Sequence, residues 1–460
     1  MDRLSLLDAA FLDLEQSGPS IAVGGVMELQ GKPPTIDELR EFIKSRLKKM
    51  PRFHQAVVSS RTKIRHAKWV NVKPDLEHHV RNVKLKRGQS IDDAVSQLME
   101  TPLDRTRPLW DCTMVTGYST KRFAVITRIH HSIADGQGAV LLLGQMIDVS
   151  PDGSMTLAQG IEMMAQPTDA SGPETVEPLG RLDGLETKIL GAIEATFEGA
   201  GKFISTYPDT MRTLISMLPQ RASELGGMVS SKRRWVGGQY SLVEVKKARK
   251  SFKGVTINDM VLASVALGFT RLLQSRGEDP QGRTLRAVMP VSLRKNADAN
   301  NQVSILPAPL PLGDMDPVKR MRMIKKSTKV SKRSMLPQIT DQALKITQKL
   351  SPAPIQEKVV SKTGSMAQYF SETLVTNVPG PQVPLYFMGR QAVSNIPIIP
   401  IEGSLRIIVG ITSFMDELNI GITGDGQYAA DVDILLAGVQ EGFDELVDLA
   451  KELAAGQPAS

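Results

Sequence analysis

Hydrophobic positions along the chain follow helix and strand periods in turn, so the sequence predicts mixed α/β structure over most of its length. Residues 34–49 predict a helix, because acidic side chains open the pattern and lysines close it, as the helix dipole favours. A second helix opens at residues 90–93, and residues 138–146 are apolar enough for a buried helix. Residues 123–129 predict a strand, because β-branched and aromatic residues are enriched there.

The second half of the chain repeats this mixture. Residues 260–273 are apolar nearly all round, which predicts a buried helix, and residues 404–409 and 418–423 predict strands. The last helix is expected to bury one face made of Leu436, Val439, Phe443, Leu446 and Leu453.

Between these halves, glycine and proline punctuate residues 150–184, and a helical pattern follows at residues 189–204. The apolar stripe of that helix either packs between two domains or lies in a lipid interface. We therefore divide the chain into an N-terminal domain (1–150), a crossover linker with an amphipathic helix (151–235) and a C-terminal domain (236–460).

Composition places the chain among globular proteins, since 41% of its 460 residues are hydrophobic and 23% are charged. The formal net charge of +7 indicates an anionic partner, or merely an excess of surface lysine. The basic run at residues 319–333 could meet ligand phosphates or a membrane surface, or form a solvated helix face. Aromatic residues make up only 5% and none interleave with this run, so we expect no nucleic acid partner.

Several classes of site are not indicated. Cys112 is the only cysteine, which rules out an intramolecular disulfide and gives no sign of an oxidising compartment. Two early carboxylates in residues 1–8 argue against a signal peptide, and no apolar stretch approaches a membrane span. Metal, P-loop and dinucleotide motifs do not occur, so we predict no metal and no cofactor. We expect a cytoplasmic protein, peripheral to a membrane.

The sharpest motif is His130-His131-Ser132-Ile133-Ala134-Asp135-Gly136, directly after the strand at residues 123–129. Side chains alternate along a strand, so we expect His130 and His131 to point in opposite directions, one toward a channel and one into packing. Gly136 permits a tight turn before the next helix. A bare His pair is usually structural, and we interpret His78-His79, which has no Asp or Gly at matching offsets, in that way.

With Asp135 and Gly136 in place, the segment resembles the HHxxxDG signature of coenzyme A-dependent acyltransferases. The resemblance continues in order along nearly the whole chain and is to the bacterial wax ester synthase/diacylglycerol acyltransferase family. One departure is Asn300-Asn301, where the family often has Gly-Asn. The blocks that carry the resemblance are Leu6–Phe11, Arg107-Pro108-Leu109-Trp110, Thr256-Ile257-Asn258-Asp259, Met289–Arg294, Thr376–Pro381 and Leu418–Gly421.

The resemblance implies a two-domain chloramphenicol acetyltransferase-like fold with an active-site tunnel between the domains. It implies transfer of a long-chain acyl group from acyl-CoA, a substrate rather than a cofactor, to diacylglycerol or a long-chain alcohol. It also implies peripheral contact with the inner membrane or lipid droplets. Two alternatives stay open: a related enzyme using a carrier-protein thioester and another lipid alcohol, and a non-catalytic lipid-droplet surface protein.

The same resemblance assigns roles within the motif. A hydroxyl is a poor nucleophile until a base takes its proton, and histidine, with a pKa near 6.5, suits that task. The family places the base at the second histidine, His131. Asp135 is expected to be structural and to pair with an arginine, for which Arg294 is the candidate. No G-x-S-x-G elbow occurs, and we interpret Cys112 as a small core residue rather than a nucleophile.

The remaining candidates have two interpretations each. Asn258 and Asp259 either cap a helix or shape the active-site channel. Thr376 and Asn377 either supply an oxyanion donor or fix the following turn. The three residues Pro108, Leu109 and Trp110 either form the acceptor-side wall of the site or pack in the core.

Overall fold

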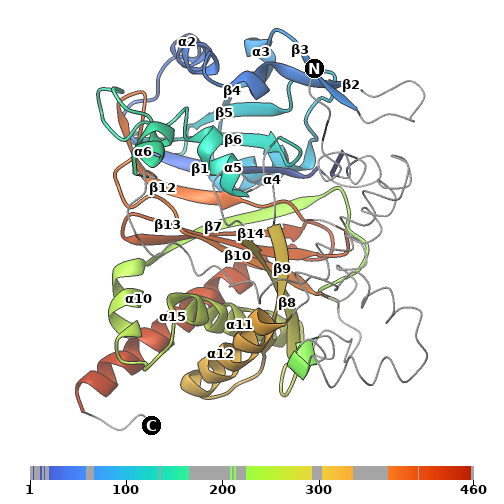
Figure 1. Ribbon diagram of the computed structural model, residues 1–460, viewed down its shortest axis with the longest axis vertical. Helices are drawn as coiled ribbons and strands as arrows, with labels where there is room; N and C mark the ends of the chain where they lie inside the picture. The colour runs from blue at the N-terminus through green and yellow to red at the C-terminus, as the bar shows by residue number, and fades with distance from the viewer. Residues whose placement is uncertain are drawn as a thin grey trace, which may run out of the picture.

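Two six-stranded sheets carry most of the regular structure in the computed structural model (Figure 1). The structure describes residues 4, 11–12, 15, 20–58, 67–133, 136–164, 208–209, 212–213, 224–292, 303–334, 371–401 and 403–456. The first sheet runs, in spatial order, β11 (Tyr386–Phe387), β12 (Arg390–Ile398), β1 (Ala22–Gln30), β6 (Arg122–His130), β5 (Trp110–Thr116) and β4 (Val80–Lys84).

The second sheet is mixed. Its strand β10 (Thr373–Val378) runs parallel to both of its neighbours, β13 (Ile407–Phe414) and β8 (Thr284–Ser292), while the other strand pairs of this sheet are antiparallel. A separate hairpin joins β2 (Gln55–Val58) and β3 (Lys68–Asn71). The second sheet runs β7 (Arg233–Ser241), β14 (Glu417–Asp425), β13 (Ile407–Phe414), β10 (Thr373–Val378), β8 (Thr284–Ser292) and β9 (Val303–Pro311).

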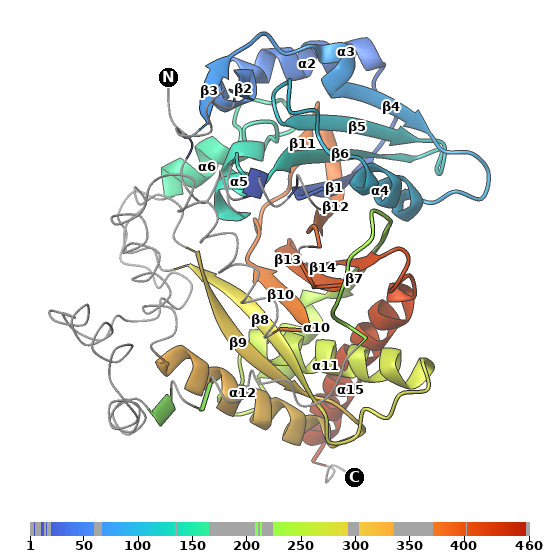
Figure 2. The same cartoon turned by 90° about the vertical axis from the view of Figure 1, so that its right-hand side faces the viewer.

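Helices α10, α11, α12 and α15 cover one face of the second sheet, and α2 and α3 lie over the first (Figures 1 and 2). The sequence explains their ends: Thr35, Ser90 and Thr256 each close a capping box at a helix start. The described helices are α2 (Ile36–Leu47), the 3₁₀ turn η1 (Pro51–His54), α3 (Leu76–His79), α4 (Ile91–Glu100), α5 (Gly136–Leu143), α6 (Leu157–Met164), α10 (Leu242–Arg249), α11 (Ile257–Ser275), α12 (Pro317–Arg333) and α15 (Val432–Ala454).

The predicted elements match most of these. The helices expected at residues 34–49 and 260–273 and the strand at 123–129 are confirmed as α2, α11 and β6. The expected buried face of the last helix is wrong at its end, since Leu453 is 38% exposed beyond the part of α15 that packs on α11. The strand expected at 404–409 begins at Ile407. The helix predicted at 189–204 lies outside the described residues.

The two sheets meet along β12, which comes from the second half of the chain but pairs with β1 of the first (Figure 2). Glycines in the second sheet allow this approach, because a Cβ on Gly421 would lie 2.1 Å from the Pro397 carbonyl oxygen. Trp235 Nε1 donates to the same oxygen at 3.3 Å. The domain boundaries at residues 150 and 235 stay a prediction. A simple division of the chain at these residues does not anticipate that β12, from the C-terminal part, pairs with β1.

Candidate active site

The turn that carries the His motif begins where β6 ends. His130 is the last residue of β6 and pairs with Ala22 of β1, while His131 opens the turn that leads to α5. His130 is fully buried and His131 is half-buried, while the opposite directions of their side chains and the channel stay a prediction. The His131 ring lies against Phe11, with ring centroids 4.1 Å apart.

His130 holds this turn through its backbone and its ring. Its N–H donates to the Leu109 carbonyl at 2.9 Å, and its own carbonyl accepts from the Ile133 N–H at 2.9 Å. Ring atom Nδ1 accepts from the Ser132 backbone N–H at 3.1 Å. Ring atom Nε2 points the other way and lies 3.4 Å from a carboxylate oxygen of Glu15.

Glu15 is buried beneath the motif, with only 6% of its surface exposed. Arg105 donates to Oε2 through Nη2 at 3.0 Å and Nε at 3.3 Å, and the Ile21 N–H donates to Oε1 at 3.2 Å. Burial alone would raise the pKa of the Glu15 carboxyl, but His130, Arg105 and Ile21 together outweigh it and lower the pKa to about 2. Glu15 is therefore an ionised carboxylate buried beside the His motif.

Sequence reasoning missed Glu15. It lies 90 residues from Arg105 along the chain, so no local pattern joins the two. The available signal was a carboxylate next to the apolar Leu14, before the first strand, and nothing in the sequence separates it from the neighbouring Asp13. Asp135 and Arg294 lie outside the described residues, and so does the proposed pair between them; Gly136 is the first residue of α5, so the helix begins before the start predicted at residue 138.

Pro108, Leu109 and Trp110 enter β5 as packed residues. Leu109 is fully buried and its carbonyl holds the His130 N–H. Trp110 is 1% exposed, donates from Nε1 to the Phe53 carbonyl at 3.0 Å, and stacks on His79 with centroids 4.4 Å apart. These contacts are those of core packing, and a role in the acceptor-side wall stays a proposal.

The other histidine pair and the cysteine have the surroundings of structural residues. His79 Nδ1 lies 2.7 Å from the Trp110 carbonyl, and burial lowers the pKa of His79. Cys112 is fully buried on β5, and burial, with the nearby charge of Asp111, raises the pKa of its thiol to about 12. A thiol with that pKa is not a nucleophile near neutral pH.

On the second sheet, two predicted site residues that are far apart in sequence touch. Asn377 on β10 donates from Nδ2 to Oδ1 of Asn258 on α11 at 3.2 Å. Asp259 instead completes a capping box, since its Oδ2 accepts from the Thr256 N–H at 2.9 Å and hydroxyl at 2.8 Å. The helix-capping interpretation therefore holds for Asp259, and Asn258 is left as the residue that meets the sheet.

Thr376 lies on the other face of β10 from Asn377, because side chains alternate along a strand. Its neighbour Val375 packs into the helix-side core, so Asn377 shares that side and Thr376 faces the first sheet. Gly410 pairs with Thr376 and is itself approached by Ile399, just after β12. Within the described residues the Thr376 hydroxyl has no hydrogen-bond partner, although the residue is only 8% exposed.

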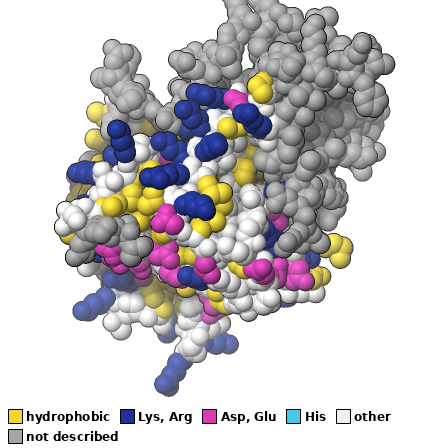
Figure 3. Space-filling view, turned by 90° about the horizontal axis from the view of Figure 1, so that it is seen from below, with side chains coloured by type: hydrophobic (Ala, Val, Ile, Leu, Met, Phe, Trp, Pro, Cys, Tyr) yellow, Lys and Arg dark blue, Asp and Glu magenta, His cyan; other side chains and the backbone are white. Residues whose placement is uncertain are grey.

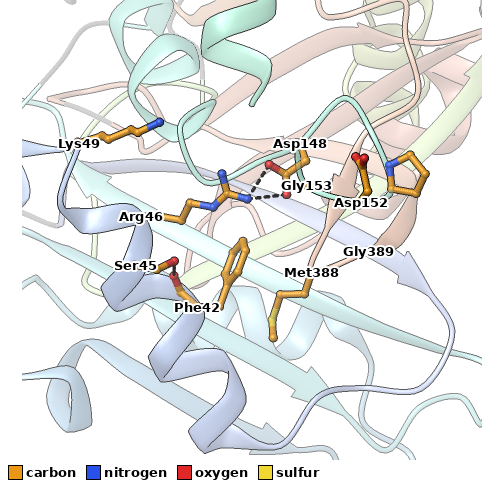
Figure 4. A pocket seen from close by; sticks show the side chains of 10 residues that line it. Phe42, Ser45, Arg46, Lys49, Asp148, Asp152, Gly153, Met388 and Gly389 are labelled. Carbon is orange, nitrogen blue, oxygen red and sulfur yellow. Dashed lines mark hydrogen bonds and ion pairs between the residues drawn. The ribbon is translucent and has the colours of Figure 1, made fainter. Parts of the chain in front are cut away.

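A pocket of about 510 Å³ lies elsewhere, between α2, the loop 148–153 and the turn at 388–389 (Figure 4). Arg46 reaches across it to Asp148, with Nη2 at 2.6 and 2.7 Å from the two carboxylate oxygens. No described residue of the His motif lines it, so this pocket does not show the predicted tunnel, which stays a prediction. Among the described residues no group of His, Cys, Asp and Glu side chains is placed to hold a metal ion.

The comparisons with known proteins decide the family. The model of the wax ester synthase/diacylglycerol acyltransferase catalytic domain matches residues 4–261, and that of the WS/DGAT C-terminal domain matches residues 299–447. The chain belongs to this family. It is an O-acyltransferase of the wax ester synthase/diacylglycerol acyltransferase type, as the ordered motifs predict.

Relatives cover nearly the whole chain. The probable diacylglycerol O-acyltransferase tgs1 of Mycobacterium tuberculosis is 30% identical, over 98% of this chain and 97% of its own length. The O-acyltransferase WSD of Acinetobacter baylyi is 26% identical over 92% of both chains.

Solved structures confirm the predicted two-domain fold. The wax ester synthase/diacylglycerol acyltransferase from Marinobacter aquaeolei VT8 superposes with a TM-score of 0.68 at 22% identity, covering 99% of this chain and 100% of that one. The first condensation domain of the CDA synthetase shares the fold with a TM-score of 0.55 at 15% identity, covering 100% of this chain and 97% of its own.

Proposed function

We propose that this acyltransferase moves a long-chain acyl group from acyl-CoA to diacylglycerol, and also to long-chain alcohols, with His131 as the general base. The observation that carries the assignment of the base is the contrast between the two histidines. His130 is buried and occupied with the turn, whereas His131 is half-buried at its start. The relatives' names supply the acceptor class.

In this mechanism His131 takes the proton of the acceptor hydroxyl as its oxygen attacks the thioester carbonyl. A tetrahedral oxyanion forms, and its collapse breaks the carbon–sulfur bond. The leaving coenzyme A thiolate then recovers the proton from His131. No acyl-enzyme intermediate is needed, which agrees with a buried Cys112 whose thiol pKa is raised to about 12.

The oxyanion needs a donor placed where its charge develops. We assign this role to the Thr376 hydroxyl, which faces the first sheet and has no hydrogen-bond partner among the described residues. Asn258 and Asn377, joined at 3.2 Å on the opposite face of β10, would set the position of that strand against α11. In the same proposal Asp135 pairs with Arg294, and residues 108–110 support the acceptor side through the Leu109 contact to His130.

The proposed acceptors are water-insoluble lipids, so the enzyme would work at the cytoplasmic face of the inner membrane or at lipid droplets. In the described residues no helix combines the length and apolarity needed to cross a bilayer. The proposed association is therefore peripheral.

The deciding experiment measures thiol release from palmitoyl-CoA, with diacylglycerol or hexadecanol added separately. Wild type is expected to release thiol only when an alcohol is present, and folded His131→Ala is expected to lose the reaction. His78→Ala is the matched control, because it removes a histidine from the structural pair at α3. If wild type releases nothing with either alcohol but accepts a carrier-protein thioester, the donor assignment is wrong. If neither donor reacts, the non-catalytic alternative stands.

A further inference from the structure

Helix α12 carries two opposite faces of different chemistry. Five of its basic residues are exposed and follow one another at spacings of three and four, which places them in a single stripe along the helix. The opposite side, including Met321 and Ile324, is buried against the sheet. The stripe consists of Lys319, Arg322, Lys326, Lys329 and Arg333.

A second basic segment lies beside this stripe. The end of α10 and the loop after it pass next to α12, since a Cβ on Gly254 would lie 2.8 Å from the Lys325 Nζ. Five further cations on this segment are exposed. We call the two segments together the basic face; its second part consists of Lys246, Lys247, Arg249, Lys250 and Lys253, with Lys325 between the parts.

Among the described residues, the cations of the basic face have no carboxylate partner. None of them forms a salt bridge with another described residue. This contrasts with Arg320, on the buried side of α12, whose Nη1 lies 3.8 Å from a Glu445 oxygen. Figure 3 shows Lys and Arg side chains gathered on one part of the lower surface, with acidic side chains in a separate band. The charge of this face is therefore uncompensated within the described chain.

Apolar side chains are exposed among these cations. Met323, directly after Arg322, is 45% exposed, and Val243 at the start of α10 is 48% exposed. Figure 3 also shows hydrophobic side chains between the blue ones. Long basic side chains around short apolar ones suit a surface that offers phosphate groups outside and hydrocarbon below.

We propose that the basic face docks on the surface of an anionic phospholipid bilayer. The proposal rests on the membrane association proposed above and names the face that makes it. Each Lys or Arg near such a surface contributes about 1 kcal/mol of attraction, so a face of this charge holds the protein without an inserted helix. A single-stranded nucleic acid would need aromatic side chains for stacking, and none lies on α12 or α10.

The test uses the full-length protein and a variant in which Lys319, Arg322, Lys326 and Lys329 are all changed to Gln. Glutamine keeps helix propensity close to that of Lys and Arg, so α12 should stay folded. The control variant changes four exposed cations at the end of β4 and in the loops beside the first sheet by the same charge: Lys84, Lys86, Arg87 and Lys121 to Gln. Binding is measured by co-sedimentation with phosphatidylcholine vesicles, with and without about a quarter phosphatidylglycerol.

Wild type and the control variant should bind the vesicles that contain phosphatidylglycerol, less at high salt, and the α12 variant should bind about a hundredfold to a thousandfold more weakly. Acyl transfer to diacylglycerol in neutral detergent micelles should be equal in all three proteins. If the α12 variant binds as tightly as the control, the basic face is not the surface that docks, while membrane association itself stands. Equal binding to pure phosphatidylcholine would overturn docking by charge. If wild type binds neither vesicle, both proposals fail, and an acidic protein becomes the better partner for the face.

Discussion

The Nε2 atom of His130 lies 3.4 Å from a carboxylate oxygen of Glu15, in a place where neither side chain reaches solvent. This contact joins the turn of the His motif to the N-terminal segment of the chain. The other ring nitrogen, Nδ1, lies 3.1 Å from the Ser132 backbone nitrogen, so both edges of the ring are held. We propose that the first histidine of the motif is a positioning residue and that Glu15 acts through it.

Replacing Glu15 by Gln should therefore reduce both stability and turnover. The pKa of Glu15 is lowered from 4.5 to about 2 in the fold, which corresponds to about 3 kcal/mol of stability at neutral pH. Because the folded pKa is the lower one, this contribution is present above pH 4.5 and is lost as pH falls toward 2. Urea unfolding is measured for wild type and Glu15→Gln from pH 7 to pH 3. The difference between their free energies of unfolding should become smaller as the pH falls.

Steady-state kinetics of the same variant test whether Glu15 positions the His motif. If Glu15 orients the motif, kcat should fall more than KM changes in folded Glu15→Gln, and Glu15→Asp should recover part of it. Unchanged kcat in a destabilised variant would leave Glu15 with a purely structural role.

Cys112 offers a simpler prediction. Its thiol is fully buried and its pKa is raised to about 12, so almost no thiolate exists at pH 8. Iodoacetamide should leave the native enzyme active, and Cys112→Ala should keep kcat within about twofold while lowering stability by about 1 kcal/mol. Loss of turnover in folded Cys112→Ala would reopen an acyl-cysteine mechanism.

Helices and strands that depend on residues close together in the sequence were predicted well. The helix at residues 34–49 follows from charges and a capping box within a few positions, and the buried helix after Thr256 follows from continuous apolar residues. Contacts between distant segments leave no such pattern. Asn377 and Asn258 are 119 residues apart, and the pairing of β12 with β1 joins residues more than 350 apart. The motifs named both asparagines, but only the fold shows that they touch.

The junction of the two sheets should tolerate no side chain at Gly421. A Cβ there would lie 2.1 Å from the backbone oxygen of Pro397, which cannot move without shifting β12. Gly421→Ala should therefore destabilise the protein by about 2–4 kcal/mol in urea unfolding. Gly226→Ala is the matched control, because its nearest contact would be an ordinary 3.4 Å. Equal stability of the two variants would contradict the close approach of β12.

The proposed oxyanion donor is tested by comparing two threonines on neighbouring strands. Thr376→Val removes a hydroxyl that has no partner among the described residues, so it should leave stability nearly unchanged and lower kcat by about tenfold to a thousandfold. Thr376→Ser should restore most of the rate. Thr412→Val on β13 is the control, because its hydroxyl already donates to the Asn395 carbonyl at 3.2 Å. That control should lose about 1 kcal/mol of stability and keep kcat. Should both valine variants retain wild-type kcat, the donor must come from another residue, and the Asn258–Asn377 pair becomes the next to test.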